Sequence, residues 1–149
     1  MDLEILHDKT IILNFLKENP GLHIYSIGDL DDFYWSKTTW YALRKGNIIQ
    51  SIALLYAGSD TPTLLLFYEN ESYYSIQLLE RIRDILPEKF YAHLSPGLIE
   101  VFNKKNIIDL YGVHYKMVLK KVAQEPDDSN ISKLTVSDLS AIRDFYSVS

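Results

Sequence analysis

The chain has 149 residues, of which 47% are hydrophobic and 23% charged, and these totals predict one globular domain with a substantial core. Its formal net charge of −5 argues against nucleic acid as a partner, because duplex binding needs a basic surface. Cysteine is absent, which excludes disulfides, thiolate metal sites and cysteine nucleophiles. The apolar runs are far shorter than the ~20 residues that cross a bilayer, and the acidic N-terminus has no apolar signal core. We therefore expect a soluble, cytoplasmic protein with no membrane partner.

The first part of the chain predicts two helices. Asp8 or Thr10 can cap the first helix, which residues 19–21 (Asn-Pro-Gly) end. A second helix is expected over residues 23–31. The apolar side chains expected to line the inner sides of these helices are Ile12, Phe15, Leu16, Ile24, Ile27 and Leu30.

Three strands are expected next. Residues 38–44 alternate and are rich in β-formers, which predicts a strand. Residues 45–47 (Lys-Gly-Asn) are typical of a hairpin turn. Residues 48–57 are apolar on both faces, as in a central strand buried on both sides, and residues 63–68 predict a third strand.

The longest helix is expected over residues 72–86, and Pro87 would stop it. A strand over 89–94, a short helix over 98–105 and a last strand over 115–122 follow. The apolar stripe of the long helix consists of Ile76, Leu79, Ile82 and Leu86.

The character of the chain changes after residue 122. Residues 123–130 (AQEPDDSN) contain no apolar side chain larger than alanine and predict a linker. Beyond them, Ser137 is expected to cap a helix. An amphipathic helix with so little domain around it indicates a sequence cut from a longer protein. Its apolar side chains are Leu139, Ile142, Phe145 and Tyr146.

The segment 26–43 (SIGDLDDFYWSKTTWYAL) concentrates carboxylates and aromatic rings. Its aspartates invite a metal ion, but a calcium loop would need a glutamate where Trp40 stands. We expect no metal here, although a generic divalent site remains an alternative. Carboxylates and aromatic faces also attract cations, so the segment could bind a cationic ligand; alternatively, the aspartates cap a helix end and the rings belong to the core. The candidate substrate-binding residues are Asp29, Asp31, Asp32, Trp35 and Trp40.

No catalytic constellation is visible elsewhere. The four histidines are scattered, without the spacing that would place two on one helix face, and we interpret each as structural. The chain has no Gly-x-Ser-x-Gly nucleophile elbow and no glycine-rich phosphate loop. The residues alone thus predict an α/β domain with a polar, aromatic loop and no catalytic residue.

The element order, together with residues 25–43 and the string SIALLYAG at 51–58, resembles the GNAT superfamily of N-acetyltransferases. The resemblance is to archaeal and bacterial members in which a degenerate GNAT-like domain precedes a catalytic one. It implies an α/β (α+β) fold with a mixed, mostly antiparallel central sheet flanked by helices. The implied domains are a degenerate GNAT-like domain (1–122), the linker (123–130) and the start of a truncated catalytic domain (131–149), whose residues 133–146 resemble that domain's opening strand and helix.

The resemblance also bears on the cofactor. In the family, Gln/Arg-x-x-Gly-x-Gly/Ala before the long helix holds the pyrophosphate of acetyl-CoA on backbone N–H groups. The matching residues 67–76 (FYENESYYSI) lack glycine, and they place Glu69 and Glu71 where the phosphates would lie. The family tyrosine that can protonate the CoA thiolate is replaced by Asn103, which cannot act as that acid. The chain is therefore expected to bind no cofactor itself.

The resemblance implies a non-catalytic N-terminal domain in a protein that moves acetyl from acetyl-CoA to an amine. Its partner would be the C-terminal GNAT domain of the same protein, and an uncovered edge or apolar face could also produce a homodimer. Two alternatives stay open. The chain could be a stand-alone binding module with an acidic and aromatic pocket, or a functional acetyltransferase with an unusual cofactor site.

Overall fold

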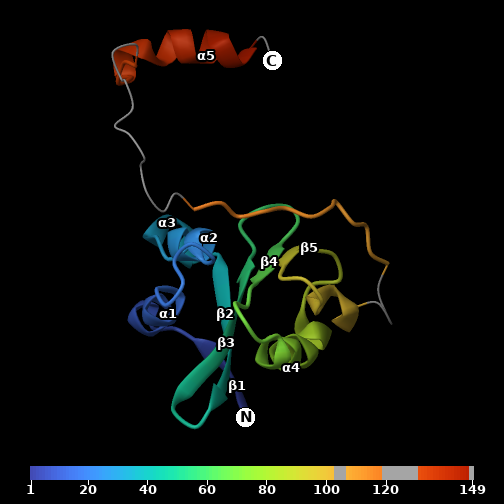
Figure 1. Ribbon diagram of the computed structural model, residues 1–149. Coiled ribbons are helices and arrows are strands. Elements are labelled where there is room, and N and C mark those ends of the chain that lie inside the picture. Colours follow the sequence, from blue (N-terminus) through green and yellow to red (C-terminus); the bar gives the residue numbers. More distant parts are fainter. Residues whose placement is uncertain (103–106, 119–130, 148–149) are drawn as a thin grey trace. The chain divides into compact units, whose positions relative to one another are not determined.

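A computed structural model describes residues 1–102, 107–118 and 131–147 of the chain (Figure 1). These residues belong to two compact units, Met1–Met117 and Val118–Ser149. The expected linker lies outside the described residues, and the expected domain boundary at 122 stays a prediction.

The first unit is built on a five-stranded sheet with the strand order β1-β2-β3-β4-β5. Neighbouring strands pair antiparallel up to β4, whereas β4 and β5 are parallel and α4 connects them. This α+β fold with a mixed, mostly antiparallel sheet confirms the predicted fold class. The strands are β1 (Asp2–Leu6), β2 (Thr38–Lys45), β3 (Ile48–Tyr56), β4 (Thr63–Leu66) and β5 (Tyr91–Leu94).

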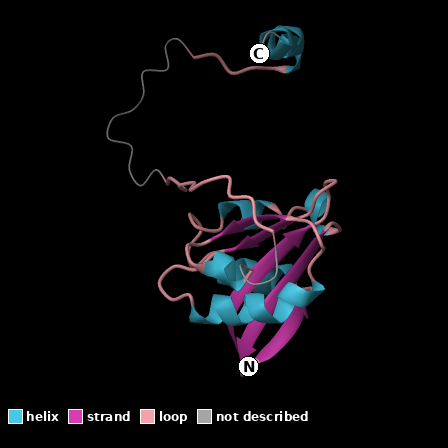
Figure 2. Ribbon diagram, turned by 90° about the vertical axis from the view of Figure 1, so that its right-hand side faces the viewer, coloured by secondary structure: helices cyan, strands magenta, loops and turns pink. Residues whose placement is uncertain are grey.

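Helices cover both faces of the sheet. α1 lies on one face with α2 and α3 near it, and α4 lies on the other face (Figures 1 and 2). Two 3₁₀ turns, η1 and η2, follow α4 and β5. The bounds are α1 (Lys9–Leu16), α2 (Ile24–Gly28), α3 (Asp32–Trp35), α4 (Tyr73–Ile82), η1 (Arg83–Ile85) and η2 (Leu98–Val101).

The core consists of two layers, because successive strand residues point to opposite faces of the sheet. On β2, Trp40 and Ala42 join the layer under α1, whereas Tyr41 and Leu43 join the layer under α4. The central position of β3 explains its continuous apolar run, and residues 51–55 are buried on both sides. The α4 layer also contains a buried hydrogen bond of 2.9 Å between the hydroxyls of Ser51 and Ser75.

Most predicted elements of the first unit are present. Asp8 caps α1, since its carboxylate accepts hydrogen bonds from the N–H groups of Thr10 and Ile11. The hairpin turn between β2 and β3 contains Gly46 at a φ of +60°, a conformation that glycine adopts without strain. The long helix is shorter than predicted: α4 ends at Ile82 and continues as η1.

Other predictions were wrong. β1 was not predicted, although the alternation of Leu3 and Ile5 with acidic residues is typical of a strand. The helix predicted over residues 23–31 is present only as α2, which ends at Gly28, and α3 was not predicted. Ile24 is exposed rather than buried. Residues 115–118 form no strand, and the rest of that predicted strand lies outside the described residues.

In the second unit, η3 (Val136–Asp138) leads into α5 (Leu139–Ser147). The cap is Thr135 and not Ser137 as predicted: the N–H of Thr135 donates to the carboxylate of Asp138 over 2.8 Å. The amphipathic helix itself was predicted correctly.

Candidate functional site

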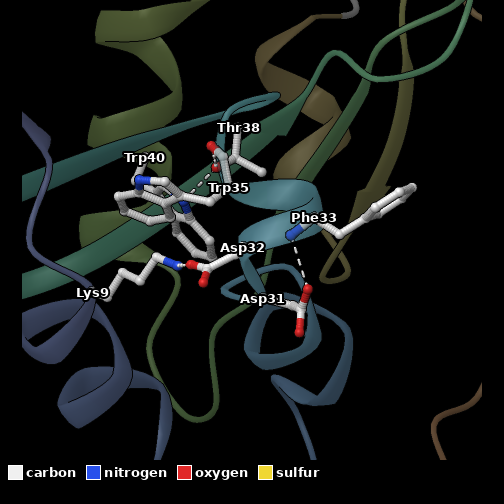
Figure 3. Close-up of polar contacts among 7 residues, drawn as sticks. All are labelled: Lys9, Asp31, Asp32, Phe33, Trp35, Thr38 and Trp40. Carbon is white, nitrogen blue, oxygen red and sulfur yellow. Dashed lines mark hydrogen bonds and ion pairs between the residues drawn. The ribbon is translucent and has the colours of Figure 1, made fainter.

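The acidic and aromatic segment extends from α2 through α3 into β2, and a side-chain cap starts α3. The carboxylate of Asp31 accepts a hydrogen bond of 2.9 Å from the N–H of Phe33. Because this cap begins a new helix, the chain turns after α2 and brings Trp35 over β2. Figure 3 shows the Asp31 carboxylate directed to this N–H group.

A lysine from α1 lies at the centre of the site (Figure 3). The Nζ atom of Lys9 is 2.5 Å from a carboxylate oxygen of Asp32 and 4.9 Å from the ring centroid of Trp35. The hydrogen bond and charge of Lys9 lower the pKa of Asp32. Trp35 in turn stacks on Trp40, with ring centroids 6.4 Å apart and planes inclined by 27°. The chain's own ammonium therefore occupies the position that a cationic ligand would take.

The two tryptophans differ in their surroundings. Trp40 is 1% exposed, and its indole N–H donates to the Thr38 hydroxyl over 2.9 Å. That hydroxyl donates to the carbonyl of Trp35 over 2.8 Å. Trp35 is half-buried. Trp40 thus belongs to the core, as expected for a ring on an inward strand position, and only Trp35 offers a ring face to a ligand.

Three of the five candidate residues lie together in the structure, and the other two have separate surroundings. Asp32 and Trp35 contact Lys9, and Trp40 stacks on Trp35. Asp31 serves as the cap of α3. Asp29 follows the end of α2, where burial raises the pKa of its carboxyl. The residue that the sequence analysis missed is Lys9, because its contact with Asp32 spans 23 positions and no local pattern signals it.

Two hollows adjoin this group. One of about 330 Å³ lies between β1, the end of α3 and the start of β2, and the other, of about 580 Å³, lies between α1 and α2. Both are open to solvent. The smaller is lined by Ile5, Leu6, His7, Trp35, Thr38, Thr39 and Trp40, and the larger by Lys9, Thr10, Leu13, Lys17, Ile27, Gly28, Leu30 and Asp31.

The second region of interest is the carboxyl end of the parallel pair β4–β5, because ligands of sheets with parallel strands bind in crevices at such ends. Here hydrogen bonds join the two segments that follow β4 and β5. The N–H of Ser95 donates to the carbonyl of Leu66, and the N–H of Tyr68 donates to the Ser95 hydroxyl, both over 3.1 Å. The Tyr68 hydroxyl donates to the carbonyl of Pro96 over 2.6 Å. These bonds close this end of the pair.

The turn between β4 and α4 does not fit a pyrophosphate. It contains no glycine, and Glu69 and Glu71 are exposed in it. Ser72 caps α4 without a side-chain hydrogen bond. Coulomb repulsion from the two carboxylates opposes an anion at this helix start, and bulky side chains keep the backbone N–H groups from a close approach. Asn103 lies outside the described residues.

Comparisons of the chain with protein-family models, with curated proteins and with solved structures found no match. Within residues 1–102, 107–118 and 131–147, no helix is long and apolar enough to cross a membrane. In the same described part, no group of three or more histidine, aspartate or glutamate side chains could hold a metal ion.

Proposed function

We propose that this chain is the non-catalytic N-terminal domain of a cytoplasmic GNAT-type N-acetyltransferase. Its partner is the C-terminal GNAT domain of the same protein, which carries the chemistry. The residues quoted above support the family, and the mixed sheet, with one parallel pair joined through α4, is compatible with it.

The observation that carries the non-catalytic role is the structure around the end of β4. The acidic turn with Glu69 and Glu71 repels phosphates, and the bonds of Tyr68 and Ser95 close the crevice beyond β4 and β5. A cofactor would have to overcome both obstacles. We therefore assign acetyl-CoA to the C-terminal domain and none to this chain.

In the whole protein, an amine would attack the thioester carbonyl while a general base takes its proton and backbone N–H groups polarise that carbonyl. This chain would brace the acceptor side of that site. Its acidic and aromatic segment suits the task, because the Asp31 cap and the stacking of Trp35 on Trp40 hold α3 in place.

A second candidate, a binding module for cationic ligands, is favoured by the position of Lys9. Asp32 and Trp35 already contact an ammonium, that of Lys9, and this supports a cation as the ligand. A ligand would have to displace Lys9, so this function requires a cation that binds more tightly than the chain's own side chain.

Calorimetric titration of acetyl-CoA into this chain tests the proposal. We expect no heat of binding at high micromolar ligand, and the same result for the double variant Glu69→Gln, Glu71→Gln, because removing the charges neither supplies glycines nor opens the crevice. Saturable one-to-one binding to the unaltered chain would overturn the non-catalytic role.

The genomic reading frame separates the two candidates. A continuation past Ser149 into a segment with Gln/Arg-x-x-Gly-x-Gly/Ala supports the acetyltransferase domain. A stop codon at that point favours the stand-alone binding module.

A further inference from the structure

Residues 107–117, which we call the strap, form neither helix nor strand, although they belong to the first unit. Figure 1 shows this segment in orange, running past β5 and β4 towards α2. Large apolar side chains of the strap are exposed. They are Ile107, Leu110, Tyr111, Val113, Tyr115 and Met117.

Three side chains of the strap contact other parts of the first unit in ways that bear on its position. Ile108 packs against the core layer under α4, and the ring of Tyr111 lies 6.1 Å from that of Tyr91 at the start of β5. The third is Lys116, at the far end of the strap. Tyr111 contacts β5, and of these three side chains it is Lys116 that contacts α2, through Tyr25.

Lys116 makes specific contacts at that end. Its Nζ atom donates to the carbonyl of Leu22 over 2.5 Å and lies 3.3 Å from the ring centroid of Phe67. The ring of Tyr25 is 5.3 Å away. A carbonyl and two ring faces together form a recognisable ammonium site. In the part of the chain that the structure describes, no carboxylate lies within ion-pair distance of this Nζ atom.

Opposing effects act on this ammonium. The carbonyl and the rings favour its charge, whereas burial opposes it and lowers the pKa of Lys116 to about 8. The charge of Lys116 in turn acts on the buried His23 nearby. Desolvation is the larger of these opposing effects, since the net result is a lowered pKa.

We propose that Lys116 is a latch that fastens residues 107–117 to Leu22, Tyr25 and Phe67, and that loss of this side chain or of its charge releases the strap. Release uncovers the ring face of Phe67 and frees the outward apolar side chains to rearrange. A modification that neutralises lysine, such as acetylation, has the same effect, because it removes the cation from the rings. This inference does not depend on the acetyltransferase proposal.

Nuclear magnetic resonance of the whole chain tests the latch. In the unaltered chain we expect the ε-methylene protons of Lys116 to be shifted upfield by the Phe67 ring, and backbone order parameters in the strap to approach the rigid value of about 0.85. Lys116→Met keeps the apolar stem but loses the donor and the charge, and it should lower the order parameters of residues 112–117 below about 0.6. Lys116→Arg should keep them high.

Lys37→Met is the matched control. Lys37 also lies over an aromatic ring, with Nζ 4.9 Å from the centroid of Phe33, but this contact does not involve the strap. The control should leave the strap rigid, and unchanged amide shifts of β3 and β4 would show that each variant is folded. A strap that is already mobile in the unaltered chain would overturn the proposal. So would a strap that stays rigid in Lys116→Met.

Discussion

The acidic and aromatic segment and the end of the β4–β5 pair are two places in the described part of the chain that we considered as ligand sites, and they are blocked in different ways. At the first, the groups for binding a cation are assembled, and a side chain of the same chain, Lys9, occupies them. At the second, hydrogen bonds of Tyr68 and Ser95 join the segments that follow the two strands, and the neighbouring turn has the wrong charge for an anion. A site of the first kind can be opened by one substitution, whereas the second would need a new backbone.

The largest effect is expected within the first region, where one tryptophan is core and the other is not. Trp40→Ala should lower the free energy of unfolding by about 3–5 kcal/mol, because it leaves a large cavity and removes one of the two hydrogen bonds of the Thr38 hydroxyl. Trp35→Ala should cost about 1–2 kcal/mol, since that ring is half-buried. Urea denaturation of both variants measures the difference. Equal losses would show that Trp35 is as much a part of the core as Trp40.

The next largest effect is expected from the protonation of a buried histidine, His23. His23 is 7% exposed, and its ring lies between those of Phe15 and Phe67, with centroids 6.2 Å from each. Burial, and secondly the charge of Lys116, lower its pKa from 6.5 to about 4. The unfolded chain therefore binds more protons than the folded chain between these values. The contribution of His23 to the free energy of unfolding should be constant above pH 6.5 and fall by about 3 kcal/mol as the pH is lowered from 6.5 to 4.

His23→Leu isolates this contribution, because it keeps an apolar side chain in the same space and cannot be protonated. The difference in unfolding free energy between the variant and the unaltered chain, measured by urea denaturation at several pH values, should change across that window. A difference that stays constant from pH 4 to 7 would show that His23 is not buried in its neutral form.

The features that depend on residues close together in the chain were predicted correctly from the sequence. The alternation over residues 38–44 and the continuous apolar run after the Gly46 turn predict β2 and the central β3, because their period and composition reflect burial directly. The Asp8 cap was also visible, since a cap joins neighbours in the chain. The end of α2 at Gly28 and the short helix α3 were missed, because the apolar spacing continues to Leu30 and outweighed the capping signal of Asp31.

The location of the candidate site was easier to predict than the set of residues that form it. The segment 26–43 does bring Asp32, Trp35 and Trp40 together, but their neighbour Lys9 comes from a helix 23 residues earlier. Contacts at such separation depend on how helices pack on the sheet, which one sequence does not encode as a local pattern. The separate role of Asp29 likewise follows from burial at the end of α2.

The closure of the second region can be weakened without creating a site. Ser95→Ala removes the acceptor for the Tyr68 N–H and should lower the free energy of unfolding by about 1–2 kcal/mol, because Ser95 is buried and its partner is left unpaired. Tyr68→Phe, which removes an exposed hydroxyl, should cost less. Neither variant should bind acetyl-CoA in the calorimeter. Binding by Ser95→Ala would mean that closure alone, and not the acidic turn, excludes the cofactor.

The smallest expected effect tests the comparison most directly. It shows whether the acidic and aromatic segment binds an external cation once the ammonium of Lys9 is removed. Lys9→Met keeps a linear apolar side chain but frees Asp32 and the Trp35 ring. We expect n-butylammonium to change the tryptophan fluorescence of this variant in a saturable way, with a dissociation constant above about 1 mM, since exposed cation–π and ion-pair contacts are weak. Salt should weaken the binding further. The unaltered chain and the double variant Lys9→Met, Asp32→Asn should not respond. If Lys9→Met is silent too, then Asp32 and Trp35 hold Lys9 only because the fold places it there, and the binding-module function loses its support.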